Sequence, residues 1–526
     1  MNRTQRTTLV ATGLGLFMIY LDALIVNVAL PSIQGGFGVG EAGLQWVAAA
    51  YSLGMAVFIM TAATLADLQG RRRWYVIGIM AFTLASIACG IAPSLLVLNI
   101  ARGVQGVAAA TTTVTSLALV SAAFPDAKQK SRAIGIWTAI ASVGTAIGPT
   151  LGGVLVDQFG WRSIFLVNVP VGILVVFLSL RYLTESRHDR PRRPDLLGQA
   201  LFALTVGSLA YAVIGAPNEG WGSPLTLALF ALTAIGGFVF VRVEQRSADP
   251  MMDLSLFRLG VYALSIGTIF VVFFSVYGML LLTTQYLQNV RHYSAMQTGL
   301  MILPFSVALM VLSPFVGRLV GRFGVRWPIL VGLAALILGL LAIIASGHGS
   351  VGFVLLGLGL AGVGGALCLT PITTLAMTSV PPERAGMASG IMSAQRAIGS
   401  TVGYAVLGSV LAARLSATLD RDLTPLLPVA AERQAVAAAI ISSANPHAQA
   451  AEIAPRKPIT HPDPALEEAI TAVADRDFVE GIHVALWGAV GLQLVALLVG
   501  WRWFPRGDAA LGEAQREEAK LASSET

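Results

Sequence analysis

Asp22 is the only acidic side chain deep inside any of the long apolar runs of this chain, and the run around it extends from Leu9 to Leu30. A carboxylate at membrane depth is costly, so an intramembrane acid predicts a functional site. Uptake and release of protons is the chemistry that an isolated carboxylate offers there. The alternative for Asp22 is a structural hydrogen bond to a helix end.

Arg102 lies several residues inside another apolar run, with Gln105 one turn further on. A buried guanidinium needs an acidic or carbonyl partner, and Asp22 is the embedded acid available to it. We therefore expect Asp22 and Arg102 to act together in proton coupling. The simpler interpretation is that the long side chain of Arg102 snorkels to an interfacial water layer.

The composition places these residues in a membrane. The chain has 526 residues, of which 55% are hydrophobic and 12% charged, and its mean hydropathy is +0.74. A soluble protein of this size carries far more charge, so we expect an all-α polytopic membrane protein. The pI near 9.5 reflects basic loops on one side of the membrane rather than nucleic-acid binding. Cys89 and Cys368 fall in apolar runs, which argues against disulfides and zinc. No cofactor or metal is expected.

Fourteen apolar runs are long enough to cross a hydrocarbon core. The expected spans are residues 8–30, 44–66, 74–92, 95–122, 133–156, 163–183, 196–215, 224–241, 261–287, 296–316, 327–346, 351–376, 385–412 and 480–503. Basic residues follow the even-numbered spans, as Arg71 to Arg73 follow the second, whereas the intervening short loops hold few. The positive-inside rule then predicts a multi-pass protein of the bacterial inner membrane with both termini cytoplasmic.

An internal repeat divides the chain. Residues 63–72 read ATLADLQGRR and residues 317–326 read GRLVGRFGVR, each after a span that should end in the cytoplasm. Such a loop can recur by chance, but a true repeat relates the halves in parallel, as in transporters built from two six-helix bundles. The expected divisions are an N-terminal six-helix bundle (1–195), two inserted helices (196–241), a C-terminal six-helix bundle (242–503) that contains a long extracellular loop (413–478), and a cytoplasmic tail (504–526). Within the loop, 429–443 is expected to be a short helix and 446–464 irregular.

Five stretches resemble signature motifs of the major facilitator superfamily. They are LDALIVNVALPSI (21–33), ATLADLQGRR (63–72), LNIARGVQGVAAA (98–110), GTAIGPTLGGVL (144–155) and WRSIFLVNVPVG (161–172). Together they resemble the 14-helix group of drug:proton antiporters across nearly the whole chain. The resemblance implies the major facilitator fold, with two six-helix bundles plus two inserted helices, and transport by alternating access.

The resemblance also implies gating roles for two of the motifs. The expected gating residues of the loop motif are Asp67, Gly70, Arg71 and Arg72. Their charge-assisted hydrogen bonds are expected to form only when the cytoplasmic side closes. The loop departs from the family pattern at Ala63 and Leu68, where Gly and Arg are usual, and its second-half copy has Gly321 in place of the acid.

A glycine face supplies the second expected gate. Gly144, Gly148 and Gly152 are spaced by four, so a neighbouring helix can approach them closely, and Pro149 deletes a backbone hydrogen bond. Gly153 completes this set. Ordinary small-residue packing in a membrane bundle explains the spacing equally well, and the resemblance to the antiporter motif favours the gate.

Polar and aromatic residues near the cavity-lining spans of the resembling family are the expected substrate contacts. They are Asn27, Trp46, Tyr51, Tyr277, Gln285 and Arg396. Aromatic walls with few fixed polar groups bind varied lipophilic compounds, although packing or an interfacial belt is the alternative for each aromatic residue. Arg396 has no acidic neighbour in sequence and either lines the cavity or pairs with carbonyl groups.

The resulting hypothesis is a proton-coupled multidrug efflux transporter, not an enzyme, for lipophilic or amphiphilic antibiotics such as tetracycline-like or spectinomycin-like compounds. Its expected partners are small-molecule drugs, protons and the lipid bilayer, with no nucleic acid, and it is expected to be a monomer. No lysine follows a glycine as in a P-loop, and no constellation of acids, bases or metal ligands predicts a membrane enzyme. The alternatives left open are an exporter of an endogenous lipid or metabolite, an uptake system and a non-transporting membrane sensor.

Overall fold

The computed structural model describes residues 3–124, 126–186, 194–247, 249–347, 349–381, 384–443 and 464–505. In this part of the chain, 14 helices are long and apolar enough to cross a membrane, and all regular elements are helical. The predicted all-α membrane fold with its fourteen spans is therefore confirmed. The predicted tail (504–526) is outside the described residues from residue 506 onward, and so is the predicted irregular segment 446–464 except for its last residue.

Most helices extend beyond one or both ends of the apolar runs that predicted them, and the predicted span 163–183 is divided into two helices, α6 and α7. In chain order the helices are α1 (Arg3–Phe37), α2 (Glu41–Gln69), α3 (Arg71–Gly90), α4 (Leu95–Ala123), α5 (Ala127–Phe159), α6 (Ser163–Leu166), α7 (Asn168–Tyr182), α8 (Leu196–Glu219), α9 (Pro224–Glu244), a short 3-10 helix (Leu254–Arg258), α10 (Gly260–Gln285), a π-helical turn (Tyr286–Val290), α11 (Ala295–Phe323), α12 (Arg326–Ser346), α13 (Val351–Thr378), α14 (Ala385–Asp422), α15 (Ala430–Ser443) and α16 (Pro464–Trp503).

Side chains and glycines at the ends explain where several helices start and stop. Ser94 caps α4 by accepting a hydrogen bond from a backbone N–H, and Ser294 forms a capping box with Gln297 at the start of α11. Helices α2 and α5 end at Gly70 and Gly160, where φ is +118° and +77°. Residues with side chains rarely adopt these angles, so glycine sets both ends.

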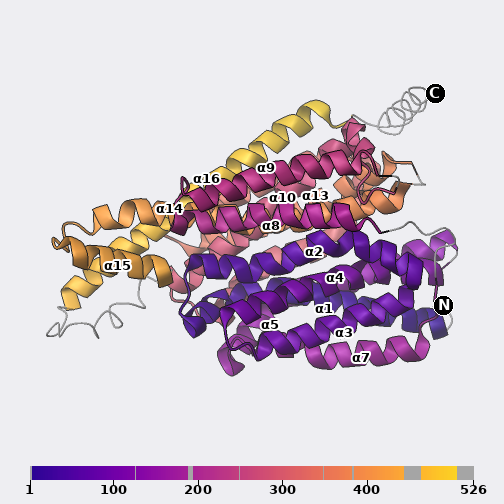
Figure 1. The fold of residues 1–526 in the computed structure, drawn as a ribbon, viewed down its shortest axis with the longest axis horizontal. Coiled ribbons are helices and arrows are strands. Elements are labelled where there is room, and N and C mark those ends of the chain that lie inside the picture. The colour runs from indigo at the N-terminus through magenta and orange to yellow at the C-terminus, as the bar shows by residue number, and fades with distance from the viewer. Residues whose placement is uncertain are drawn as a thin grey trace.

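The membrane helices form two groups that run side by side along the long axis (Figure 1). In the first group, α1–α7, α1 packs on α5 and α7, and α4 packs on α2 and α3. In the second group, α10–α14 with α16, α10 packs on α13 and α14, and α12 packs on α13 and α16. The groups meet along two seams, α2 with α14 and α5 with α11.

Helices α8 and α9 pack on each other, and α8 also packs on both α2 and α14. The amide of Gln199 donates to the carbonyl of Val57 on α2 at 2.6 Å, and the hydroxyl of Ser409 on α14 donates to the carbonyl of Val213 on α8 at 2.7 Å. The inserted pair therefore covers one of the two seams and is tied to both groups.

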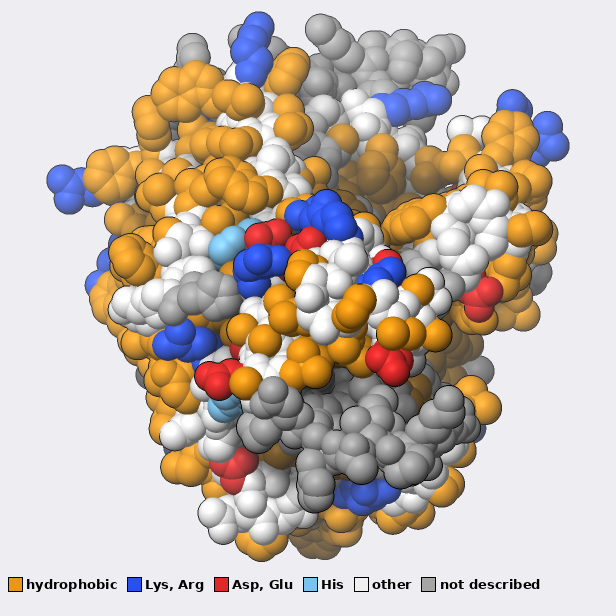
Figure 2. Space-filling view, turned by 90° about the vertical axis from the view of Figure 1, so that its left-hand side faces the viewer, with side chains coloured by type: hydrophobic (Ala, Val, Ile, Leu, Met, Phe, Trp, Pro, Cys, Tyr) orange, Lys and Arg blue, Asp and Glu red, His pale blue; other side chains and the backbone are white. Residues whose placement is uncertain are grey.

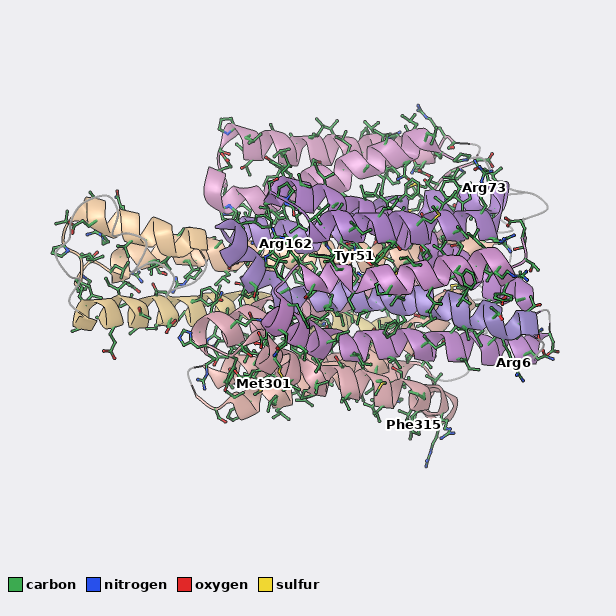
Figure 3. The ribbon with its side chains drawn as sticks, turned by 90° about the horizontal axis from the view of Figure 1, so that it is seen from below. Arg6, Tyr51, Arg73, Arg162, Met301 and Phe315 are labelled. Carbon is green, nitrogen blue, oxygen red and sulfur yellow. The ribbon has the colours of Figure 1, made fainter. Side chains whose placement is uncertain are left out.

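The two ends of the bundle differ. Helix α1 begins and α16 ends at what we call the termini end, and the opposite end, the α15 end, carries α15 (Figure 1). Arg6 and Arg73 lie at the termini end, and Tyr51 lies deep in the bundle between the two ends (Figure 3). These names fix directions without reference to the sides of a membrane.

Helices extend into both edges of the segment 413–478, which we predict to be a loop. Helix α14 continues to Asp422 and α16 begins at Pro464, while α15 lies where the short helix 429–443 is predicted. Leu419 of α14 and Ile440 of α15 belong to one buried apolar cluster at this end. That shared apolar face stabilises the extensions, and the polar composition of the segment concealed it.

The surface at the α15 end mixes both signs of charge among apolar side chains (Figure 2). Arg414 of α14 pairs with Glu480 of α16 at 3.3 Å, and Arg433 of α15 pairs with Asp420 of α14 at 3.0 Å. Partly exposed pairs of this kind contribute little to stability, so the apolar cluster is the main contact between the extended helices.

Candidate functional site

The carboxylate of Asp22 on α1 is fully buried, with 0% of the residue exposed, and receives hydrogen bonds from three side chains. Its Oδ2 pairs with Nη1 of Arg102 on α4 at 2.6 Å. Its Oδ1 accepts from the amide of Gln105 on α4 at 3.0 Å and from the amide of Asn168 on α7 at 2.9 Å. Three helices of the first group therefore build the surroundings of this one carboxylate.

The guanidinium of Arg102 is enclosed as completely, because only 1% of the residue is exposed. It donates to the backbone carbonyl of Val47 at 3.2 Å and to Oε1 of Gln105 at 2.7 Å. The ring of Tyr51 lies 4.4 Å from its central carbon and the ring of Phe165 lies 5.7 Å away. Arg102 therefore does not snorkel to an interface, since its charge is neutralised inside the bundle.

Gln105 connects the network to α3. It lies one turn after Arg102 on the same face of α4, and its amide also donates to the hydroxyl of Ser86 at 2.8 Å. The neighbouring Cys89 thiol donates to Oε1 of Gln105 at 3.8 Å. The sequence analysis assigned no role to Gln105 or Asn168. For Gln105, its position three residues after Arg102 was the one sequence feature that indicated a place in this network.

This arrangement can hold or release a proton with a structural consequence. An ionised Asp22 fits these surroundings, because both carboxylate oxygens accept hydrogen bonds and the positive charge of Arg102 balances the negative charge. A proton on the carboxylate removes its charge and weakens the bond to the guanidinium, which is strong because both partners are ionised. Protonation and the packing of α1 on α4 and α7 are therefore linked.

The predicted loop gate forms a local pair at the termini end. Asp67 Oδ1 accepts from Arg71 Nη2 at 2.8 Å, one turn apart and partly exposed. Arg72 instead donates to the backbone carbonyl of Ser179 at 3.3 Å. The carboxylate of Glu185 accepts from the backbone N–H of Arg72 at 2.9 Å, and thereby caps α3 beside Gly70. These contacts stay inside the first group, and the gating role of Asp67, Gly70, Arg71 and Arg72 stays a prediction.

The glycine face of α5 packs against α1 within the first group. A Cβ atom added to Gly144 would lie 2.5 Å from the carbonyl oxygen of Phe17, and one added to Gly152 would lie 2.7 Å from the side chain of Ile25. At Gly148 the nearest atom, the Leu21 carbonyl oxygen, would be 3.3 Å away. The three glycines thus permit close approach of α1, with the tightest space at Gly144.

Two other residues of the same motif face the second group. A Cβ atom on Gly153 would lie 2.5 Å from the Cα atom of Met296 on α11, and the carbonyl of Pro149 lies against Gly299. The motif therefore touches α1 on one side and α11 on the other. A displacement of α5 necessarily affects both contacts.

Asp157, beyond the motif, joins the two groups at the α15 end. Its carboxylate accepts from the hydroxyl of Ser294 at 2.7 Å and from the backbone N–H groups of Ala295 and Met296 at 3.2 and 3.0 Å. An acid of the first group thus caps the N-terminus of α11 in the second, where the helix dipole favours negative charge. The sequence analysis missed this residue.

Glu41, the first residue of α2, joins the groups at a buried position. It is 5% exposed, and its Oε1 accepts from the amides of Gln285 on α10 and Gln45 on α2 at 3.1 and 3.4 Å. Its Oε2 has no hydrogen-bond partner among the described residues. Gln45 Oε1 in turn accepts from the hydroxyl of Ser409 on α14 at 3.3 Å. The predicted substrate residue Gln285 therefore belongs to a buried contact between groups.

Four of the remaining predicted substrate residues lie in three different surroundings. Trp46 packs on Tyr211 of α8, with ring centroids 5.8 Å apart, and so contacts the inserted helices. Asn27 accepts a hydrogen bond from the hydroxyl of Tyr404 at 3.1 Å, and the ring of Tyr404 lies 5.7 Å from that of Tyr277. Tyr51, between α1 and α4, covers the charge network.

Arg396 on α14 lies near this aromatic set. Its Nη2 donates to the hydroxyl of Thr373 on α13 at 2.9 Å, and its central carbon lies 5.9 Å from the ring of Phe273. Arg396 was expected either to line the cavity or to pair with carbonyl groups. Its polar partner in the described contacts is a hydroxyl and not a carbonyl group.

Among the described residues, the hydrogen bonds between the two groups lie in the half of the bundle nearer the α15 end. They involve residues Asn27, Val28, Glu41, Gln45, Thr145, Thr150 and Asp157 of the first group. Polar contacts therefore join the two groups at the α15 end.

The fold and its buried charge network define a helical membrane transporter built from two helix groups. Residues 12–404 match the sequence profile of the Major Facilitator Superfamily, and the chain belongs to this family. The resemblance inferred from the motifs is thereby confirmed.

Three relatives are similar over most of this chain. The multidrug resistance protein Stp of Mycobacterium tuberculosis is 65% identical over 522 residues, which cover 99% of this chain and 96% of Stp. The drug efflux pump JefA of the same species is 43% identical, over 97% of this chain and 100% of its own. The tetracenomycin C resistance and export protein of Streptomyces glaucescens is 34% identical, over 94% and 90%.

Solved structures share the fold at low sequence identity. A bacterial homologue of the human lysosomal transporter Spinster matches with a TM-score of 0.63 and 18% identity, over 96% of this chain and 100% of that chain. A D-xylose-proton symporter matches with a TM-score of 0.59 and 12% identity, over 95% and 98%. At these identities the likeness concerns the fold alone.

Proposed function

We propose that this chain is a proton-coupled drug efflux transporter that works by alternating access. The observation that carries the proposal is the Asp22 carboxylate, fully buried and held by Arg102, Gln105 and Asn168. Intramembrane acids with a named cationic partner are typical of proton relays. The names of Stp, JefA and the tetracenomycin C protein, which refer to drug resistance, efflux or export, support drugs as the substrates.

The proposed orientation follows the charge pattern of the short loops. The termini end, with Arg71, Arg72 and Arg73, faces the cytoplasm, and the α15 end faces the outside of a bacterial inner membrane. The conformation described is then closed on the outside. In this proposal residues 1–195 and 242–503 are the two moving bundles, 196–241 is inserted between them, and 413–478 is extracellular.

The proposed cycle uses the link between protonation and packing at Asp22. With the outside closed, Asp22 is ionised and paired with Arg102, as after release of a proton to the cytoplasm. Drug binding then precedes opening of the α15 end, where Asp22 takes up a proton and the drug leaves. A proton that crosses with the membrane potential supplies about 2.3 kcal/mol per 100 mV, and an imposed pH gradient adds to it.

Gating is proposed for the contacts that must break or form in this cycle. At the α15 end these are the contacts of Gly153 and Pro149 with α11, and Gly144, Gly148 and Gly152 give α5 its close fit to α1. At the termini end Asp67 and Arg71 are proposed to meet the second group when that end closes. Asn27, Tyr51 and Tyr277 are proposed to contact substrate.

The test is transport by inverted vesicles that contain the purified protein. A panel of labelled compounds that includes tetracycline and spectinomycin is supplied with and without an imposed pH gradient. We expect gradient-driven uptake of at least one compound, and a drop of about tenfold or more for Asp22→Asn, since Asn keeps the size but cannot ionise. Asp22→Glu should retain part of the activity.

The matched control is Glu219→Gln, which removes an exposed acid at the end of α8. It should transport like the parent, with equal protein in the membrane. Gradient-driven transport by Asp22→Asn at the parental rate would refute proton coupling through this residue. Failure of every compound in the parent protein would refute the drug assignment.

A further inference from the structure

Arg396 carries a positive charge well inside α14, eleven residues after Ala385, where this helix begins. No ion pair joins it to an acid among the described residues. Arg102, the other deeply placed arginine, is neutralised by Asp22. Arg396 instead has a hydroxyl partner, Thr373, and its Nε is buried without a hydrogen-bond partner. A guanidinium is always charged in proteins, and no anion among the described residues balances the charge of this partly buried one.

The position of Arg396 is accessible. Arg396 is partly exposed, and so are Ser389 and Ser393, which precede it by seven and three residues on α14. Helix α14 packs on α2, α8, α10 and α16, and Arg396 keeps part of its surface exposed in spite of these contacts.

A partly exposed aromatic stripe lies opposite on α10. Phe270, Phe273 and Tyr277 are partly exposed on a helix that is otherwise largely buried, and Gly267 adds open space one turn before them. The rings of Phe273 and Tyr277 are stacked, with centroids 5.7 Å apart and planes inclined by 16°. The central carbon of Arg396 lies 5.9 Å from the centroid of the Phe273 ring, which places the charge beside the stacked pair.

We propose that Arg396 binds an acidic oxygen of the transported molecule, while the Phe273 and Tyr277 rings contact a planar ring system of the same molecule. The inference rests on the proposed function and names the substrate class: planar aromatic compounds that bear a carboxylate, enolate or phenolate. An ionised oxygen supplies the missing anion through a charge-assisted hydrogen bond. A phospholipid phosphate offers the same charge, but its acyl chains do not match flat stacked rings.

The experiment compares two dyes that share one planar ring system. Rhodamine 110 has a free carboxylate, and rhodamine 123 is its methyl ester. Their binding to the purified protein in phosphatidylcholine nanodiscs is measured by fluorescence anisotropy, without a proton gradient. We expect rhodamine 110 to bind about tenfold more tightly, as one charge-assisted hydrogen bond implies. Arg396→Gln should abolish this preference by weakening rhodamine 110 alone, and Arg396→Lys should keep part of it.

The control variant is Arg322→Gln, which removes the same charge from an exposed position in the last turn of α11. It should leave both affinities within about twofold of the parent. Equal affinities of the two dyes for the parent, equal losses in Arg396→Gln, or no binding of either dye would overturn the proposal. Loss of the preference in nanodiscs that contain phosphatidylglycerol would assign Arg396 to a lipid headgroup and overturn it too.

The result is separable from that of the efflux test. Binding in nanodiscs needs no proton gradient, so a carboxylate preference that depends on Arg396 can persist in a protein that fails to pump. Conversely, drug efflux that depends on Asp22 but ignores the rhodamine carboxylate leaves the proposed function intact and removes only the substrate class.

Discussion

The carboxylate of Asp157 at the end of α5 accepts a hydrogen bond from the hydroxyl of Ser294 at the start of α11, 2.7 Å away, and so joins the two helix groups at the α15 end. Two backbone N–H groups of α11 donate to the same carboxylate. All three bonds must break if the groups separate at this end. Asp157 therefore stabilises the conformation in which the two groups meet at the α15 end.

Asp157→Asn should weaken this contact. An amide lacks the negative charge that favours the helix N-terminus, and the loss is about 1 kcal/mol, or roughly a fivefold rise in the open population. Spin labels attached to Phe159→Cys and Gly349→Cys report the distance between the groups by pulsed electron paramagnetic resonance. The native Cys89 and Cys368 are fully buried and should not react with the label. Glu219→Gln serves as the control, and an unchanged distance distribution in Asp157→Asn would contradict the role.

Gly144→Ala should disturb the fit of α5 to α1. The new Cβ atom would lie 2.5 Å from the Phe17 carbonyl oxygen, which belongs to backbone and cannot rotate away. We expect a loss of about 1–3 kcal/mol and impaired transport. Gly148→Ala, with 3.3 Å to its nearest atom, should cost much less. Gly135→Ala on the same helix has nothing within 4 Å and is the control. Thermal unfolding in detergent ranks the three, and equal melting temperatures would exclude a packed face.

Asp67→Asn should separate stability from transport. Its pair with Arg71 is partly exposed and one helical turn apart, so its loss should change stability by less than about 0.5 kcal/mol. If Asp67 acts when the termini end closes, the transport rate should nevertheless fall severalfold at normal expression. Vesicle transport and a melting curve measured on the same preparation decide the question, and parental transport would remove Asp67 from the mechanism.

The proposed topology predicts which cysteines react in intact cells. Glu432 on α15 and Arg73 on α3 are both exposed, at opposite ends of the bundle. A membrane-impermeant maleimide should label Glu432→Cys and not Arg73→Cys, and permeabilised cells should show both. Labelling of Arg73→Cys alone would invert the orientation.

The core of the candidate site was predictable because a charged residue inside an apolar run can be recognised from the sequence alone. Asp22 and Arg102 stand out in this way, and the length of the runs predicts the fourteen helices. Asn168 could not be predicted, since it reaches Asp22 from a helix 146 positions further along the chain. Glu41 and Asp157 lie at the edges of apolar runs, where acids usually face water, and their contacts depend on how two distant groups pack.

Helix extensions at the α15 end were missed for a related reason. Polar composition predicts a loop at 413–478, but α14 and α16 continue because apolar residues spaced along them meet α15. An amphipathic face of this kind becomes evident only when its partner helix is in place.

The position of α8 makes the protein asymmetric toward the surrounding lipid. It lies over the seam between α2 and α14 and is bonded to both, whereas the seam between α5 and α11 has no comparable helix packed on it in the described part of the chain. A lipophilic molecule dissolved in the bilayer therefore meets α8 and α9 in front of the α2–α14 seam. At the other seam it meets α5 and α11 directly. If the two groups separate within the membrane plane, a lipophilic molecule can enter from the lipid between α5 and α11.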